Sequence, residues 1–243
     1  MATLYGMTYS PWTERARWAL DVLGVEYRFK EHVPLLGEAL LRRRARQAGV
    51  QRVTVPLLVD GDRVVTDSFE IMRFADQRAD GRLETARPEV AAWVERIEPA
   101  LELIRRRVTR STLQDAAALK EAATAAAPAF LAGLLRPVAV MGARHIAKKY
   151  RFDADAEEAT PQVLIETLDA LRAALGSGGH VVGDGFTAAD ILGATLLQGV
   201  RPVEGYVKVG PETTRMWHDP AVAERYADLL AWRDEVYARY RRA

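Results

Sequence analysis

The periodicity of this chain changes once, near residue 82, and that change constrains the fold more than any other feature. Before it, short strand-like runs alternate with apolar residues at helical spacing, whereas after it the spacing is helical throughout. A length of 243 residues allows two modest domains. The sequence therefore predicts a mixed α/β domain over 1–81 and an all-helical domain over 88–243, with a linker that starts at Arg82.

The first domain is predicted to have the order β-α-β-α-β-β-α. We expect strands at 3–5, 25–29, 53–59 and 63–66, and helices at 12–23, 35–48 and 69–78. Asp60-Gly61-Asp62 is a tight hairpin signal, so the last two strands should be antiparallel.

The second domain is predicted to consist of helices only. We expect them at 88–112, 114–135, 138–149, 161–175, 187–200 and 220–241. The most apolar stretch, 125–143, contains Pro128, Arg136 and Pro137. These interruptions favour a buried helical turn-around over a membrane span, and a wall of an apolar ligand pocket is the alternative.

Charge and cysteine content exclude several classes of function. The net charge of +1 gives no electrostatic reason to expect nucleic acid as the main partner. Arginine clusters at 42–46, 105–110 and 148–151 are expected to be solvated helix faces. The absence of cysteine removes disulfides, thiolate metal sites and catalysis by a protein thiol.

Metal binding and secretion are not indicated either. The four histidines have no metal-ligand spacing: His32, His145, His180 and His218. The first twenty residues lack the uninterrupted apolar core of a secretory signal. We expect a cytoplasmic protein without a metal.

Ser10-Pro11-Trp12 is the first of three stretches that could carry chemistry. Serine is a good N-cap and proline is favoured at the first helical position, so helix capping explains both residues. The Ser10 hydroxyl could instead take part in a reaction, and Tyr9 places a second hydroxyl beside it.

The second stretch is Val55-Pro56, within an apolar run. Proline removes a ladder hydrogen bond, so we expect an edge, a bulge or a cis peptide at this point. The backbone groups of Val55 could then pair with an extended peptide.

The third stretch is Asp67-Ser68-Phe69-Glu70. Asp67 followed by Glu70 is a capping box, and structure alone can explain it. A helix N-terminus also binds carboxylates, and the Ser68 hydroxyl adds a donor. A further capping box, Thr187 with Asp190, is interpreted as structural.

In this order and spacing the stretches resemble the glutathione transferase superfamily over nearly the whole chain. The resemblance rests on SPWTERARWAL at 10–20, VPLLVDGDRVVTDS at 55–68 and GDGFTAADI at 183–191. It implies a thioredoxin-like N-terminal domain that binds glutathione, followed by a helical domain that forms the electrophile pocket. The first motif resembles the serine-type tau and zeta classes, and its Pro-aromatic-x-Glu-Arg run also resembles the omega class.

The resemblance assigns roles to residues. Ser10, five positions before Arg15, would activate the glutathione thiol, with Tyr9 as the alternative. Trp12 would border the second substrate. The remaining glutathione-binding positions would be Val55, Pro56 as a cis-proline, Asp67 and Ser68 for the γ-glutamyl end, and Gln51 and Arg52 for the glycine carboxylate.

The implied function is a cytoplasmic, homodimeric glutathione transferase of detoxification type, acting on a small hydrophobic electrophile. A specialised isomerase or dehalogenase, a user of another small thiol, and a non-catalytic ligand-binding protein are the alternatives. Neither nucleic acid nor a membrane span is expected.

Overall fold

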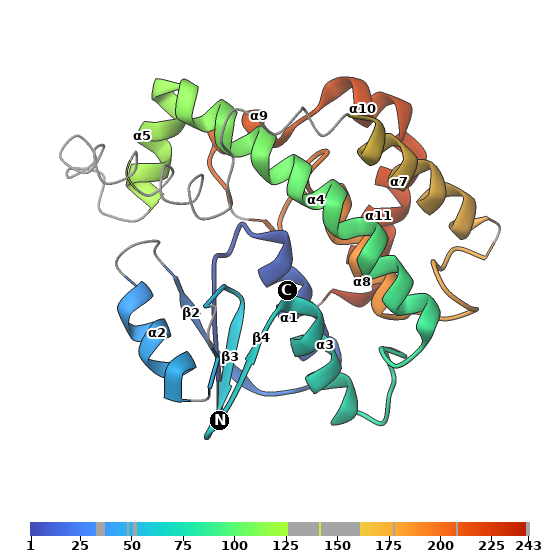
Figure 1. Ribbon diagram of the computed structural model, residues 1–243. Helices are drawn as coiled ribbons and strands as arrows, with labels where there is room; N and C mark the ends of the chain where they lie inside the picture. The colour runs from blue at the N-terminus through green and yellow to red at the C-terminus, as the bar shows by residue number, and fades with distance from the viewer. Residues whose placement is uncertain are drawn as a thin grey trace.

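The protein is described here from a computed structural model in which a sheet domain packs against a set of helices (Figure 1). The described residues are 1–32, 37–47, 49–50, 53–125, 141, 161–176, 178–207 and 209–241. Part of the expected helix at 114–135, nearly all of that at 138–149 and most of the apolar stretch 125–143 lie outside them.

Four strands form one sheet in the order β2-β1-β3-β4. Their bounds are β1 (Ala2–Gly6), β2 (Tyr27–Glu31), β3 (Leu57–Asp60) and β4 (Arg63–Thr66). β1 pairs in parallel with β2 and antiparallel with β3. β3 and β4 are antiparallel, as the hairpin signal predicts, and Gly61 in the turn has a positive φ of 58° that glycine adopts readily.

Three helices cover the two faces of this sheet. Their bounds are α1 (Pro11–Val22), α2 (Glu38–Gln47) and α3 (Ser68–Gln77). Because side chains alternate along a strand, Leu4 packs under α1 and α3, whereas its neighbour Tyr5 packs under α2. The predicted βαβαββα order and the helical C-terminal region are therefore both confirmed.

The rest of the described chain is helical. Its helices are α4 (Pro88–Gln114), α5 (Ala116–Ala125), α7 (Pro161–Leu175), α8 (Ala188–Leu197), α9 (Pro211–Trp217), α10 (Pro220–Arg225) and α11 (Ala227–Tyr240). Every residue of α8 is buried, so it is the central helix of this region. The core around it continues to Trp18 and Phe69 of the sheet domain, so the two regions share one hydrophobic core.

Several elements differ from the sequence expectation at their ends. The strands expected at 25–29 and 53–59 begin only at Tyr27 and Leu57. The helix expected at 220–241 is divided at buried Tyr226, whose hydroxyl donates to Asp169 at 2.7 Å. Helix α9 was not expected, because its seven residues are too few to show helical periodicity.

The connection between the two regions is held by one buried carboxylate. Asp76 accepts hydrogen bonds from the amides of Leu83 (2.7 Å) and Thr85 (2.9 Å), and from the Thr85 hydroxyl (2.7 Å). The predicted linker is therefore a fixed turn, and α4 starts directly after it. Among the helices of the described residues, none combines the length and the apolar character needed to cross a bilayer.

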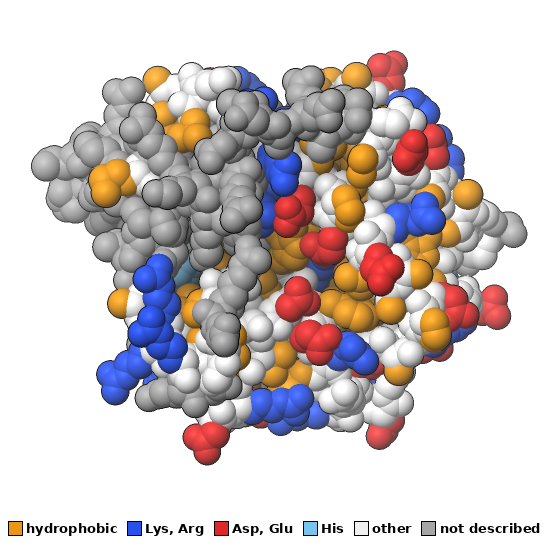
Figure 2. Space-filling model, in the orientation of Figure 1, with side chains coloured by type: hydrophobic (Ala, Val, Ile, Leu, Met, Phe, Trp, Pro, Cys, Tyr) orange, Lys and Arg blue, Asp and Glu red, His pale blue; other side chains and the backbone are white. Residues whose placement is uncertain are grey.

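The arginine clusters differ from one another. On α2, Arg43, Arg44 and Arg46 are exposed, as predicted for a solvated face, and Figure 2 shows basic side chains gathered over this helix. On α4 the expectation of a solvated face is wrong for Arg107. This side chain bonds to Asp219 and donates to the carbonyls of Gly199 and Trp217. The third cluster lies outside the described residues.

Candidate active site

Ser10 begins helix α1 but does not cap it with its side chain. Its backbone is extended (φ −82°, ψ 125°), Pro11 follows at the first helical position, and the Ser10 carbonyl accepts the Glu14 amide at 2.9 Å. The hydroxyl accepts no hydrogen bond from the first turn. Ser10 is nevertheless 94% buried, with a fractional exposure of 6%. A buried hydroxyl that the helix does not use is available to a ligand.

Tyr9 offers a different chemistry. The side chain is 36% exposed, and its hydroxyl donates to the Met7 thioether sulfur at 3.2 Å. Burial, and in second place the Glu31 carboxylate, raise the pKa of Tyr9 to about 12. The phenol therefore stays protonated at neutral pH and acts as a hydrogen-bond donor, never as a base.

Val55 and Pro56 precede β3, a central strand of the sheet. The peptide bond between them is cis, one of the geometries expected for this position and the one that the family resemblance assigns. Val55 packs against the core under α2, and Pro56 is buried. Gln51 and Arg52 lie outside the described residues.

Asp67 and Ser68 form the start of helix α3. The Asp67 carboxylate oxygen Oδ1 accepts the amides of Phe69 (2.8 Å) and Glu70 (3.3 Å). The expected capping box is only half formed, because Glu70 pairs with Arg73 and does not return a bond to Asp67. Asp67 has φ 75° and ψ 137°, a strained conformation for a residue with a side chain. Such strain is concentrated at functional sites in proteins.

Trp12 lies at the junction of the two regions. Its indole N–H donates to Glu98 Oε2 of α4 at 2.8 Å, and the other oxygen of Glu98 pairs with Arg15. Arg15 is fully buried, and its Nε donates to Thr195 of α8 at 3.0 Å. The first turn of α1, which carries Ser10, is therefore tied to two helices of the C-terminal region.

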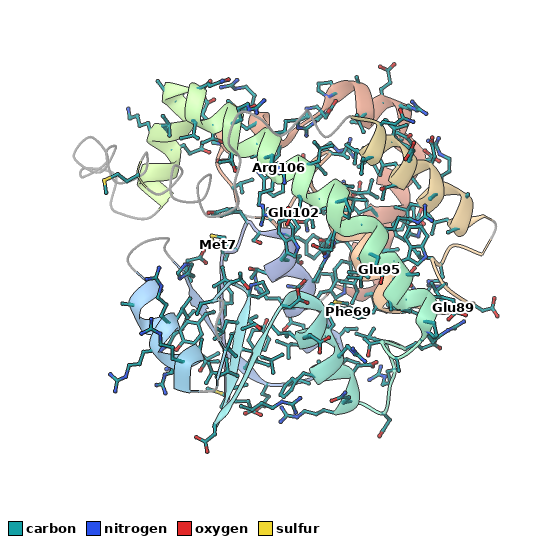
Figure 3. The ribbon with its side chains drawn as sticks, in the orientation of Figure 1. Met7, Phe69, Glu89, Glu95, Glu102 and Arg106 are labelled. Carbon is teal, nitrogen blue, oxygen red and sulfur yellow. The ribbon has the colours of Figure 1, made fainter. Side chains whose placement is uncertain are left out.

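The wall of this junction is polar. Arg105 of α4 lies over the Trp12 ring, with its guanidinium carbon 4.8 Å from the ring centroid. Figure 3 shows Glu102 and Arg106 along the part of α4 that lies above Met7. Sequence reasoning assigned no role to Glu98 and expected Arg105 on a solvated helix face, because their contacts in α1 are more than 80 residues away and no local motif marks them.

Two other features of the described residues lie apart from these positions. A surface cavity of about 430 Å³ opens at the opposite end of α1, between Arg17, Asp21, Glu26, Tyr27 and Arg241. It mixes both signs of charge and includes none of the predicted site residues. Within the described ranges, no group of His, Asp and Glu side chains has an arrangement that could hold a metal ion.

Residues 4–83 match the family described as the N-terminal domain of glutathione S-transferase. The part of the chain that matches, residues 4–83, is a glutathione S-transferase N-terminal domain. No curated protein matches the sequence.

Solved glutathione S-transferases share the whole fold. One from Methylobacterium radiotolerans, in complex with glutathione sulfonate, has a TM-score of 0.58 and 17% identity, over 98% of this chain and 91% of that one. A rice glutathione S-transferase in complex with glutathione has a TM-score of 0.57 and 19% identity, over 98% of this chain and 88% of that one. The sheet domain and the helical region are thus arranged as in these two structures, and Ser10, Pro56 and Asp67 lie within the matched range 4–83.

Proposed function

We propose that this protein is a glutathione transferase in which the Ser10 hydroxyl stabilises the thiolate of glutathione for attack on a small hydrophobic electrophile. One observation carries the proposal: Ser10 begins the first helix of a glutathione S-transferase N-terminal domain, is buried, and leaves its hydroxyl unused by the helix. The hydroxyl would donate to sulfur, and the amide end of the helix would favour the same negative charge.

The resemblance to the glutathione transferase superfamily implies the remaining glutathione contacts of the proposal. The backbone of Val55, turned by the cis bond to Pro56, would pair with the cysteinyl part of glutathione. Asp67 and Ser68 would bind the ammonium and the carboxylate of its γ-glutamyl end. This role is supported by the strained backbone of Asp67 at a helix N-terminus. Gln51 and Arg52 remain proposals for the glycine carboxylate.

Ionisation of the thiol alone gives only a modest increase in the reaction rate at pH 7. A thiol of pKa ~8.5 is only about 3% thiolate at pH 7, and a pKa lowered by about two units makes it roughly three-quarters thiolate. Nucleophilicity falls with the pKa, with a Brønsted slope of ~0.45, so the net gain is only about threefold. Most of the rate enhancement must come from holding thiolate and electrophile together.

The electrophile would lie between the turn at Tyr9 to Trp12 and helix α4, with the helical domain (88–243) forming its pocket and residues 1–81 binding glutathione. We further propose a cytoplasmic homodimer that acts in detoxification. The absence of cysteine supports an activity that needs no protein thiol, so conjugation, isomerisation or elimination fits better than disulfide reduction.

The test combines binding and turnover. We expect glutathione at millimolar concentration to raise the unfolding temperature, and conjugation of 1-chloro-2,4-dinitrobenzene to follow. Ser10→Ala should keep glutathione binding but lower kcat at pH 7 by up to about threefold, with the deficit shrinking as the pH approaches the pKa of the free thiol.

Thr8→Ala is the matched control, because Thr8 lies in the same loop and is not one of the proposed glutathione-binding residues. No response to glutathione, or full turnover by Ser10→Ala at pH 7, would overturn the proposal. A thermal-shift response to another small thiol but not to glutathione would point to that thiol as the substrate.

A further inference from the structure

The cavity of about 430 Å³ lies at the C-terminal end of α1, whereas Ser10 lies at the start of that helix. Its walls come from α1, from the turn at 24–26 with the first residue of β2, and from the residue that ends α11. The turn is fixed, because the amides of Gly24 and Val25 donate to carbonyls of α1 at 3.1 and 2.9 Å. The cavity therefore has the size of a small-molecule site and walls that are held in place.

Two of the charged side chains at this cavity are already paired with each other. Arg241 donates to Asp21 at 2.6 Å and also to Glu14 at 2.7 Å. The Arg241 side chain is only 5% exposed. The charges of Arg241 and Asp21 are therefore balanced within the protein, and we assign neither of them to a ligand.

Arg17 and Glu26 are the other two charged residues at the cavity. Arg17 is partly buried and Glu26 is exposed, and in the part of the chain that the structure describes no oppositely charged side chain lies within ion-pair distance of either. The Arg17 guanidinium is held over the Phe29 ring, 4.9 Å from its centroid, and its buried Nε has no acceptor among the described residues. A partly buried cation without a counter-ion has lost hydration that nothing replaces, so an anionic group stabilises it.

The surroundings of Arg17 and Glu26 favour opposite charges in a ligand. Burial, and in second place the Asp21 carboxylate, raise the pKa of Tyr27 beside Arg17 to about 12. The phenol is therefore protonated at neutral pH and supplies no negative charge to Arg17. Glu26 follows the C-terminal end of α1, whose partial negative charge adds to that of the carboxylate and favours a cation.

We propose that this cavity binds a small zwitterion, whose carboxylate pairs with Arg17 and whose ammonium group pairs with Glu26. The aliphatic body of the ligand would lie along Val25 and Tyr27, which also line the cavity. A ligand with a single charge satisfies only one of the two groups. The site shares no residue with the proposed glutathione site, and the inference does not rest on the proposed transferase function.

Amino acids with the two charges at opposite ends of chains of increasing length test the proposal: glycine, 4-aminobutyrate and 6-aminohexanoate. Their binding to the unaltered protein is measured by isothermal titration calorimetry, and the length that binds best reports the separation of Arg17 and Glu26. Butyrate and butylamine each carry one of the two charges. We expect both to bind about tenfold more weakly than the best amino acid, because one charge-assisted hydrogen bond is lost.

Variants assign the two charges to their residues. Arg17→Gln should weaken the binding of the best probe by about tenfold, and Glu26→Gln by about threefold, because the pairing of an exposed carboxylate is screened by water. Arg28→Gln is the matched control, because Arg28 is exposed beside Tyr27 on β2 and does not line the cavity. Asp67→Asn is a second control, since it alters only the proposed γ-glutamyl site. Both controls should leave the affinity for the probe unchanged.

Backbone-amide NMR of the unaltered protein gives a reading that needs no variant. The bound probe should shift the signals of residues 24–28 and leave those of residues 67–70 in place. Absence of binding by all three amino acids, equally strong binding of butyrate or butylamine, or signal shifts confined to residues 67–70 would overturn the inference. The proposed transferase function is tested separately, by the response of the protein to glutathione.

Discussion

Helices α1 and α8 both begin at a hydroxyl residue, yet the two starts use that residue in opposite ways. At α8 the Thr187 hydroxyl accepts the Ala189 amide at 3.2 Å, and the Asp190 carboxylate returns a bond to the Thr187 amide at 2.7 Å. At α1 the Ser10 hydroxyl makes no capping bond. The same residue type is therefore structural where the helix uses its hydrogen-bonding capacity, and a candidate for chemistry where the helix does not.

The surroundings of the two starts support this difference. Asp190 is fully buried and also accepts the Val181 amide at 2.9 Å, so it joins two segments of the helical region. Around Ser10 the structural bonds are made by other residues: Trp12 and Arg15 bind Glu98, and the Thr8 amide donates to Glu31 at 3.0 Å. The first turn of α1 is therefore fixed without the Ser10 hydroxyl.

The largest expected effect is that of Asp190→Ala, which tests the structural side of the comparison. It leaves the amides of Val181 and Thr187 buried without their acceptor, and each such loss costs ~1–3 kcal/mol. We expect the free energy of unfolding to fall by about 3 kcal/mol in urea denaturation. Asp184→Ala, an exposed change in the preceding loop, should cost less than about 0.5 kcal/mol. Equal losses would contradict the structural role of Asp190.

Glu98→Ala should cause the second largest loss of stability, because it removes the acceptor of the Trp12 indole and of buried Arg15. Loss of one partner of a buried pair costs ~3–5 kcal/mol, and since Glu98 is 34% exposed we expect about 2 kcal/mol. The measurement is chemical denaturation, with Glu95→Ala, exposed on the same helix, as the control. A stability equal to that of the control would show that α1 is not held by this contact.

Removing the hydroxyl that begins each helix should change the stability by smaller amounts. Thr187→Ala should lower the free energy of unfolding by ~1–2 kcal/mol, as removal of a working N-cap does. Ser10→Ala should change it by less than about 0.5 kcal/mol, because no capping bond is lost. Thermal unfolding of both variants checks this, and a cost for Ser10→Ala as large as that for Thr187→Ala would make Ser10 an ordinary cap.

Tyr9→Phe should have the smallest effect on catalysis. Because burial raises the pKa of Tyr9 to about 12, this phenol is protonated throughout a pH profile of kcat/KM measured between about pH 6 and pH 10. We therefore expect the pH dependence of kcat/KM to keep its shape and midpoint in the variant. A shifted midpoint would assign the thiol contact to Tyr9.

Sequence patterns predicted what depends on neighbouring residues. The order of elements in the sheet domain, the hairpin at Gly61 and the capping box of Thr187 all follow from short-range periodicity and turn chemistry, and the structure has them. The strand ends were less well predicted, because β3 begins after Pro56 and not at Val53.

Contacts between distant residues could not be predicted in this way. Glu98 and Trp12 are 86 positions apart, and Arg107 bonds to Asp219 across 112 positions. The arginines of α4 therefore looked like a solvated face. Nor could any local pattern decide whether the Ser10 hydroxyl caps its helix, since serine before proline fits both cases.

The most direct test is the pKa of the glutathione thiol bound to this protein, followed by the ultraviolet absorbance of the thiolate during a pH titration. We expect a value clearly below the ordinary thiol pKa of ~8.5 in the unaltered protein, and a rise of at least about one unit in Ser10→Ala. An equal thiol pKa in the two proteins, with glutathione bound in both, would contradict the assignment of Ser10 as the group that stabilises the thiolate.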